Sequence, residues 1–144
     1  MSIVSRAIPA KYNGIERRGL MDALDASQSL VWFDGAGVIV DANANALRLF
    51  SYGDGDILRQ DYFALCGSNS KRILADKREW ARISAGDMCH TERSYTAQDG
   101  REVWSSVNFA ALKNDDGSTR RVLAMFNDMG RFAWKPNDVR WGGY

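Results

Sequence analysis

The feature that most constrains the fold is a strict two-residue alternation between Arg101 and Leu112. Its odd-numbered positions are mostly apolar, and its even-numbered positions form the opposite face. Val122, Ala124 and Phe126 alternate in the same way with Leu123 and Met125 in a run from Thr119 to Asn127. Because both faces carry apolar side chains, we expect both faces of a sheet to be covered, one by helices and the other by an N-terminal helix or a second subunit.

Turn residues place these runs in an antiparallel meander. Asp99-Gly100 separates a strand-like run over 88–97 from the alternating run, and Asp115-Asp116-Gly117 precedes the last one. Upstream, the pattern predicts two short strands at 30–33 and 38–41, joined by a tight turn. It also predicts helices over 14–29, around Ala46 to Phe50, and from Asn69 to about Ala85, with one-turn helices between 53 and 66.

Composition narrows the classes of protein. A chain of 144 residues can build one core but not two domains. Nineteen basic and eighteen acidic residues give a net charge of +1, which offers no case for nucleic acid or an anionic membrane as main partner. No apolar run approaches the ~20 residues that span a bilayer, and the first residues lack a signal-peptide pattern, so we expect a cytoplasmic protein.

Few residues are candidates for a metal-binding, cofactor-binding or catalytic role. Cys66 and Cys89 are too few for a disulfide scaffold and lack zinc spacing. Aspartates at 34, 41, 54 and 56 stand in or beside turns, where capping explains them better than a metal, so no metal site is expected. His90, the single histidine, stands at the start of a strand and is either a surface residue or a haem ligand. No phosphate loop, nucleophile elbow or HExxH motif occurs, so no catalytic residue is predicted.

Two stretches carry a family resemblance. ALDASQSLVWFDGAGVIVDANANALRLFSY has an Asp-x-x-Gly hairpin and Asp-Ala-Asn before a helix, and GDMCHTERSYTAQDGREVWSSVNFAALKNDDGSTRRVLAMFNDMG has Asp-Gly-Arg-Glu-Val-Trp. Both resemble the PAS modules of bacterial chemoreceptors and sensor kinases. Asp128 stands where the family has its Asp-Ile-Thr signature. The resemblance covers roughly residues 22–130.

The resemblance implies an α+β fold. We expect a five-stranded antiparallel sheet in the order 2-1-5-4-3, with helices on one face and an N-terminal flanking helix. We expect a flanking helix or extension over 1–21, a PAS domain over 22–130 and a tail over 131–144. The family's strand pattern assigns an inward set that would line a ligand pocket: Tyr95, Val103, Ser105, Val107, Phe109, Val122, Ala124 and Phe126. It assigns to a dimer surface Leu20, Leu24, Trp104, Asn108, Leu123 and Met125.

The function implied is a non-enzymatic sensory module that dimerises, with a pocket that can take a small ligand or stay without one. The inward set suits a small apolar ligand, and it equally suits a filled core. A cofactor is not required; the alternative is a haem sensor using His90, or a flavin sensor. Cys66 lacks the Asn-Cys-Arg-Phe motif of the light-sensing relatives, so an inert buried thiol is expected. The 131–144 tail, rich in Trp and Gly, replaces the usual signalling helix, which implies a partner protein or a further output domain.

Overall fold

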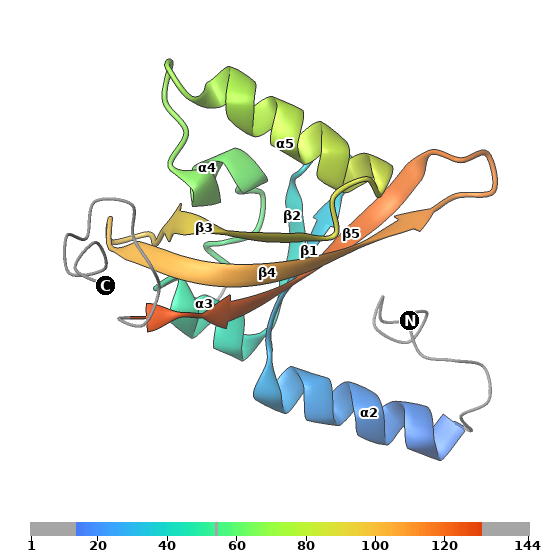
Figure 1. Ribbon diagram of the computed structural model, residues 1–144. Helices are drawn as coiled ribbons and strands as arrows, with labels where there is room; N and C mark the ends of the chain where they lie inside the picture. The colour runs from blue at the N-terminus through green and yellow to red at the C-terminus, as the bar shows by residue number, and fades with distance from the viewer. Residues whose placement is uncertain (1–13, 54, 131–144) are drawn as a thin grey trace, which may run out of the picture.

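The C-terminal half forms the predicted meander of three long strands. In the computed structural model, which describes residues 14–53 and 55–130, two further strands and four helices complete the domain (Figure 1). Along the chain these elements are α2 (Gly14–Ser27), β1 (Ser29–Asp34), β2 (Ile39–Ala42), α3 (Ala44–Leu49), α4 (Tyr62–Cys66), α5 (Ile73–Ala85), β3 (His90–Thr96), β4 (Glu102–Lys113) and β5 (Thr119–Asp128).

The sheet confirms the predicted topology, antiparallel in the order β2-β1-β5-β4-β3. β1 pairs with β5 although the two are far apart in sequence, with Phe33 opposite Val122. Because β5 lies between β1 and β4, the hairpin of β1 and β2 lies beside the meander. Strands β2 and β3 are the two edges of the sheet.

The two sheet faces have separate apolar clusters. The larger one contains side chains of α3, α4 and α5 together with the inward residues of the strands. A smaller cluster on the opposite face contains Leu30, Trp32 and Leu123, against which Met21 and Leu24 of α2 pack. Both faces are therefore covered as the alternation predicted, and α2 is the cover of the outer face.

Helix α5 differs from its prediction only at its start. It begins at Ile73, because the Asn69 side chain accepts hydrogen bonds from the backbone N–H groups of Lys71 and Arg72 and holds a turn there. It ends as predicted at Gly86, whose φ of 87° closes the last turn.

The domain limits expected from the sequence remain predictions. Helix α2 runs without a break across the expected limit between residues 21 and 22. The first 13 residues of the extension over 1–21, and the tail over 131–144, lie outside the described residues.

Two asparagines join α2 to the sheet, and we call this pair the asparagine junction. Asn43 is buried; its Oδ1 accepts from the N–H of Leu30 and of Ala46, and its Nδ2 donates to the carbonyls of Asp25 and Gln28. Asn45 Nδ2 reaches the carbonyls of Asp25, Ala26 and Gln28, each at 3.1 Å. The junction fixes where α2 ends and β1 begins.

Candidate functional site

The inward set lies on the helix-covered face, as the strand pattern predicted. None of its residues is more than 6% exposed. The members are Tyr95, Val103, Ser105, Val107, Phe109, Val122, Ala124 and Phe126. Aromatic rings of the helical segment contact this set edge-on: the Phe50 ring centre lies 5.0 Å from that of Phe126, and the Tyr62 ring centre 6.1 Å from that of Phe109.

The polar side chains on this face form hydrogen bonds with other groups of the protein. Ser105 Oγ donates to the carbonyl of Asn127 at 3.0 Å, and the hydroxyls of Tyr95 and Tyr62 share a hydrogen bond of 2.9 Å. The inward set therefore acts as a hydrophobic core here, and its role as a ligand pocket stays a prediction.

A buried polar cluster, which we call the α5–β3 clamp, lies beside that core. Arg93 Nη1 on β3 stands 3.0 Å from Asp76 Oδ1 and 3.0 Å from Glu79 Oε2, two carboxylates about one turn apart on α5. The Tyr62 hydroxyl donates to Glu79 Oε1 at 2.5 Å, and Ser68 Oγ donates to Asp76 Oδ2 at 2.6 Å. The clamp thus fastens α4 and α5 to the edge strand of the sheet.

Burial sets the protonation of the groups around the clamp. It raises the pKa of the Tyr62 and Tyr95 hydroxyls, and it raises the pKa of the Cys66 thiol to about 12, so all three are protonated at neutral pH. For Asp76, burial alone would raise the pKa of the carboxyl, but hydrogen bonds from Ser68 and Arg93 outweigh burial and lower the pKa below 3.8. Asp76 is therefore ionised and paired with the guanidinium.

The clamp leaves one donor unused. Arg93 Nη2 is buried and has no hydrogen-bond partner among the described residues. A buried donor without an acceptor is costly, and such atoms in folded proteins call for an explanation such as a bound water or ligand.

The sequence contains a signal for the clamp that lies outside both motifs and apolar alternation. Asp76 falls on the same helical stripe as Trp80 and Ile83, both buried, so a carboxylate is placed on the core face of α5. Arg93 stands two residues before Tyr95 and so shares its inward face of β3. An acid and a base on two core-facing positions predict a buried ion pair.

We expect acid to remove the stabilisation that Asp76 contributes. Because the pKa of Asp76 is lowered in the folded chain, its contribution is present above the unfolded value of about 3.9 and is lost as the pH falls below it. Asp76→Asn should be less stable than the parent at pH 7, and the difference should narrow below about pH 4. Urea unfolding between pH 3 and pH 7 measures it; a difference that stays constant with pH would contradict this assignment.

The predicted dimer residues divide into two groups. Leu24, Leu123 and Met125 gather in the outer-face cluster, and Leu20 lies nearby on α2 with 39% of its surface exposed. Trp104 and Asn108 lie outside that cluster, on the part of β4 that pairs with β3. The indole N–H of Trp104 donates to Glu102.

His90 does not lie on the helix-covered side. It falls on the face opposite Tyr95, with Nδ1 3.0 Å from Asn108 Oδ1 and Nε2 3.7 Å from Glu92 Oε1. The inward set supplies no imidazole, so the residues present do not fit a histidine-ligated haem in the core. Among residues 14–53 and 55–130, no three His, Cys, Asp or Glu side chains group as metal ligands.

Two of the remaining acidic candidates bind backbone N–H groups nearby in the chain. Asp34 Oδ1 accepts from the N–H groups of Ala36 and Val38, and Asp41 Oδ1 accepts from the N–H of Ala42. Asp54 lies outside the described residues. No helix in the described ranges is both long enough and apolar enough to cross a bilayer.

Comparison with known proteins places this geometry in a family. The sequence profile described as a PAS domain matches residues 29–131. The biofilm dispersion protein BdlA of Pseudomonas aeruginosa is 26% identical over 120 residues, which are 83% of this chain but 29% of BdlA. The chain thus spans under a third of the length of that curated relative.

Solved structures share the fold. A domain of a sensor histidine kinase/response regulator from Geobacter sulfurreducens gives a TM-score of 0.61 at 20% identity, over 83% of this chain and all of that one. An RNA-binding light-oxygen-voltage receptor gives 0.65 at 19% identity, over 85% of this chain and 36% of that one. With its strand order, its helix-covered face and a profile match over most of its length, the chain belongs to the PAS domain family.

Proposed function

We propose that this PAS sensory domain works as a homodimer, in which α2 and the outer sheet face of one copy meet those of the other. The proposed role is non-enzymatic: dimer geometry carries a signal to a partner protein or to a further domain. We also propose a cytoplasmic location, with which the two free cysteines Cys66 and Cys89 are compatible.

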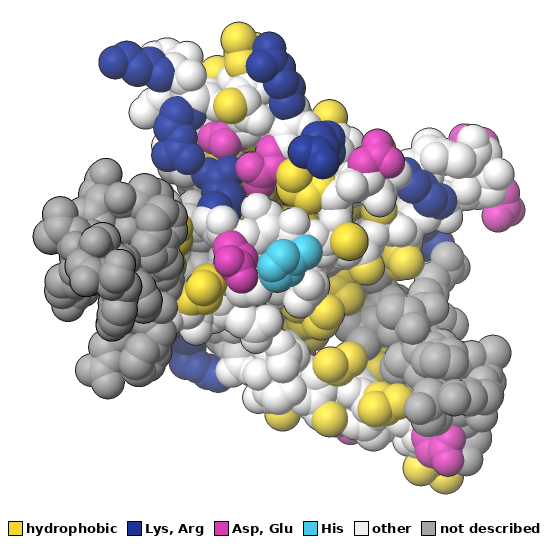
Figure 2. Space-filling view, viewed as in Figure 1, with side chains coloured by type: hydrophobic (Ala, Val, Ile, Leu, Met, Phe, Trp, Pro, Cys, Tyr) yellow, Lys and Arg dark blue, Asp and Glu magenta, His cyan; other side chains and the backbone are white. Residues whose placement is uncertain are grey.

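The observation that carries this proposal is the unburied apolar surface of α2. No residue of this helix is fully buried, and Ile15 is 81% exposed and Leu20 39% exposed. Figure 2 shows hydrophobic side chains gathered over α2 and the neighbouring part of the sheet. Large contiguous apolar patches on a soluble domain mark interaction sites.

A second copy is the occupant that this surface supports best. Leu20 lies one turn before Leu24, which packs in the same outer-face cluster as the partly buried Met125, so α2 and that face form one surface that can meet its own copy about a two-fold axis. PAS domains commonly dimerise, and the family membership supports the same choice.

Charges placed on α2 should abolish the dimer. We expect the parent chain to have twice its 16.1 kDa mass by light scattering, and Ile15→Glu with Leu20→Glu to be a monomer. Burying one such side chain contributes about 1.5–3 kcal/mol, so the pair should raise the dissociation constant by at least about a hundredfold. Both side chains are exposed in one copy, so the fold should be retained.

The matched control is Leu74→Glu, because Leu74 is 65% exposed on α5, away from α2. This variant should keep the mass of the parent. A monomeric parent at every concentration, or equal dissociation by the control, would overturn the proposed dimer.

A further inference from the structure

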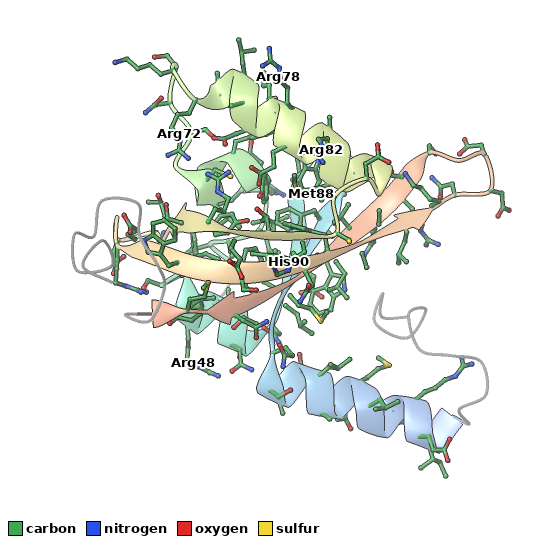
Figure 3. All side chains as sticks on the ribbon, viewed as in Figure 1. Arg48, Arg72, Arg78, Arg82, Met88 and His90 are labelled. Carbon is green, nitrogen blue, oxygen red and sulfur yellow. The ribbon has the colours of Figure 1, made fainter. Side chains whose placement is uncertain are left out.

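The exposed charges of helix α5 are all basic. Five residues of this helix and of the turn before it are basic and exposed, and we call them the α5 basic face: Lys71, Arg72, Lys77, Arg78 and Arg82. Figure 3 shows Arg72 at the start of α5 and Arg78 and Arg82 farther along it, and Figure 2 shows basic side chains gathered over this helix. None of the five forms an ion pair with another residue of the described ranges.

The α5–β3 clamp explains why this face has no acidic counterpart. Helix α5 contains two acidic residues, Asp76 and Glu79, and both are turned toward Arg93 on β3. Glu79 stands three residues before Arg82, a spacing that allows an ion pair on a helix surface. Arg93 and the Tyr62 hydroxyl engage both oxygens of the Glu79 carboxylate instead. The α5 basic face is thus left uncompensated by its own helix.

This arrangement is unfavourable for the helix by itself. Arg78 and Arg82 are four residues apart, so two like charges lie about 6 Å apart along the helix axis and repel each other. Lys71 and Arg72 stand before the first turn, at the positive end of the helix dipole. Cations that the fold does not neutralise attract a surface of opposite charge. The charge of this face therefore fits an acidic partner.

Apolar side chains lie between the charges. Leu74 is 65% exposed and stands four residues before Arg78, on the same stripe of the helix. Ala75, Ala81 and Ala85 are exposed as well, and such small side chains let a second helix approach to the about 8–10 Å of packed helices. Helix α5 has no exposed aromatic ring, and a single leucine is a poor anchor in a membrane interface. The surface thus favours a helix of another protein.

The rest of the molecule disfavours a long polyanion and a second copy. The net charge of the chain is +1, so acidic residues elsewhere offset the basic face. A nucleic acid or an anionic membrane would extend past one helix and meet those acids, whereas a single acidic helix covers only the basic face. The other long helix of the described ranges, α2, has three acidic and two basic residues and so offers no comparable negative surface.

We propose that the α5 basic face binds an acidic amphipathic helix of a partner protein. Carboxylates one turn apart on that helix pair with Arg78 and Arg82, and an apolar side chain beside them packs on Leu74. Helix α5 covers the sheet face opposite α2 (Figure 1), so both surfaces can be occupied at once. The inference names the chemistry of a partner and does not depend on the proposed dimer.

Fluorescence anisotropy with labelled synthetic peptides tests the proposal. The probe is a helical peptide of about 20 residues with glutamates one turn apart on one face and leucines beside them, and its control has glutamine in place of every glutamate. We expect the acidic peptide to bind with a dissociation constant below about 100 μM in about 50 mM salt. The glutamine control should bind at least about tenfold more weakly. Salt at about 0.5 M should weaken binding of the acidic peptide at least about tenfold, because it screens charge interactions.

Matched charge reversals locate the site. Arg78→Glu with Arg82→Glu should weaken binding of the acidic peptide at least about tenfold, and Leu74→Ala should weaken it about threefold. All three side chains are exposed, so the urea unfolding midpoint should change little. Arg48→Glu with Arg59→Glu changes the net charge equally at exposed positions outside α5, and it should bind within about twofold of the parent.

Three results would each overturn the proposal. They are no binding of the acidic peptide in about 50 mM salt, equal weakening by the two charge-reversed pairs, and tighter binding of phosphatidylglycerol vesicles or of about 20 base pairs of DNA than of the peptide. The chain with Ile15→Glu and Leu20→Glu should bind the acidic peptide like the parent. This comparison separates the fate of the α5 basic face from that of the proposed dimer.

Discussion

Replacing Asn43 by Ala should lower the free energy of unfolding by about 3–4 kcal/mol. The side chain makes four hydrogen bonds to backbone groups, and its loss leaves the buried N–H of Leu30 without its acceptor. An unsatisfied buried group costs about 1–3 kcal/mol, and loss of a helix N-cap, here that of α3, costs about 1 kcal/mol more. Equilibrium urea unfolding measures the change.

Two variants separate the parts of this effect. Asn43→Asp keeps the acceptor for Leu30 and Ala46 but sets a carboxylate oxygen against the carbonyls of Asp25 and Gln28, so its cost relative to the parent should fall as the pH drops and the carboxyl gains a proton to donate. Asn45→Ala removes contacts that are mostly solvent-exposed and should cost under about 1 kcal/mol. If Asn45→Ala proves as damaging as Asn43→Ala, burial is not what makes Asn43 important.

Replacing Arg93 by Met should lower the free energy of unfolding by about 3–5 kcal/mol. The change leaves Asp76 and Glu79 as uncompensated carboxylates beside the core, which is the costly way to break a buried ion pair. Without the guanidinium, the pKa of Asp76 should rise, and the variant should lose less stability than the parent when the pH falls below about 4. Urea unfolding at pH 7 and pH 3.5 measures both effects.

Neutralising the whole clamp is the informative control. Arg93→Met combined with Asp76→Asn and Glu79→Gln removes all three charges, and it should recover part of the stability that Arg93→Met loses. Arg78→Met, an exposed arginine on the same helix, should change stability by less than about 0.5 kcal/mol. A triple variant less stable than Arg93→Met would show that the charges themselves are not the source of the loss.

The fold followed from sequence because its signals are local and periodic. Alternation along β4 and β5, the turns at 99–100 and 115–117, and the stop at Gly86 each act within a few residues. Helix α5 starts at Ile73 and not at Asn69, because Asn69 caps a preceding turn instead of the helix itself.

The clamp was not predicted because its pairing is long-range. Arg93 is far in sequence from Asp76 and Glu79, and composition treats all three as ordinary surface charges. Similarly, the strand pattern placed Trp104 and Asn108 with Leu123 on the outer face, but a shared face does not imply a shared cluster. The structure places Trp104 near the free edge of β3 instead, where it lines a groove together with Arg72 and Met129.

The asparagine junction binds α2 only through main-chain carbonyls. The contacts from Asn43 and Asn45 reach oxygen atoms of Asp25, Ala26 and Gln28, and no α2 side chain takes part in them. The side chains of that helix can therefore be exchanged in a chimaera without loss of the hydrogen bonds of the asparagine junction. What must be kept is the number of helical residues between the fused segment and Asp25, because each residue added or removed within the helix turns everything upstream of it by about 100°. The junction would thus set the rotation, about the helix axis, of any helical segment fused in front of this domain.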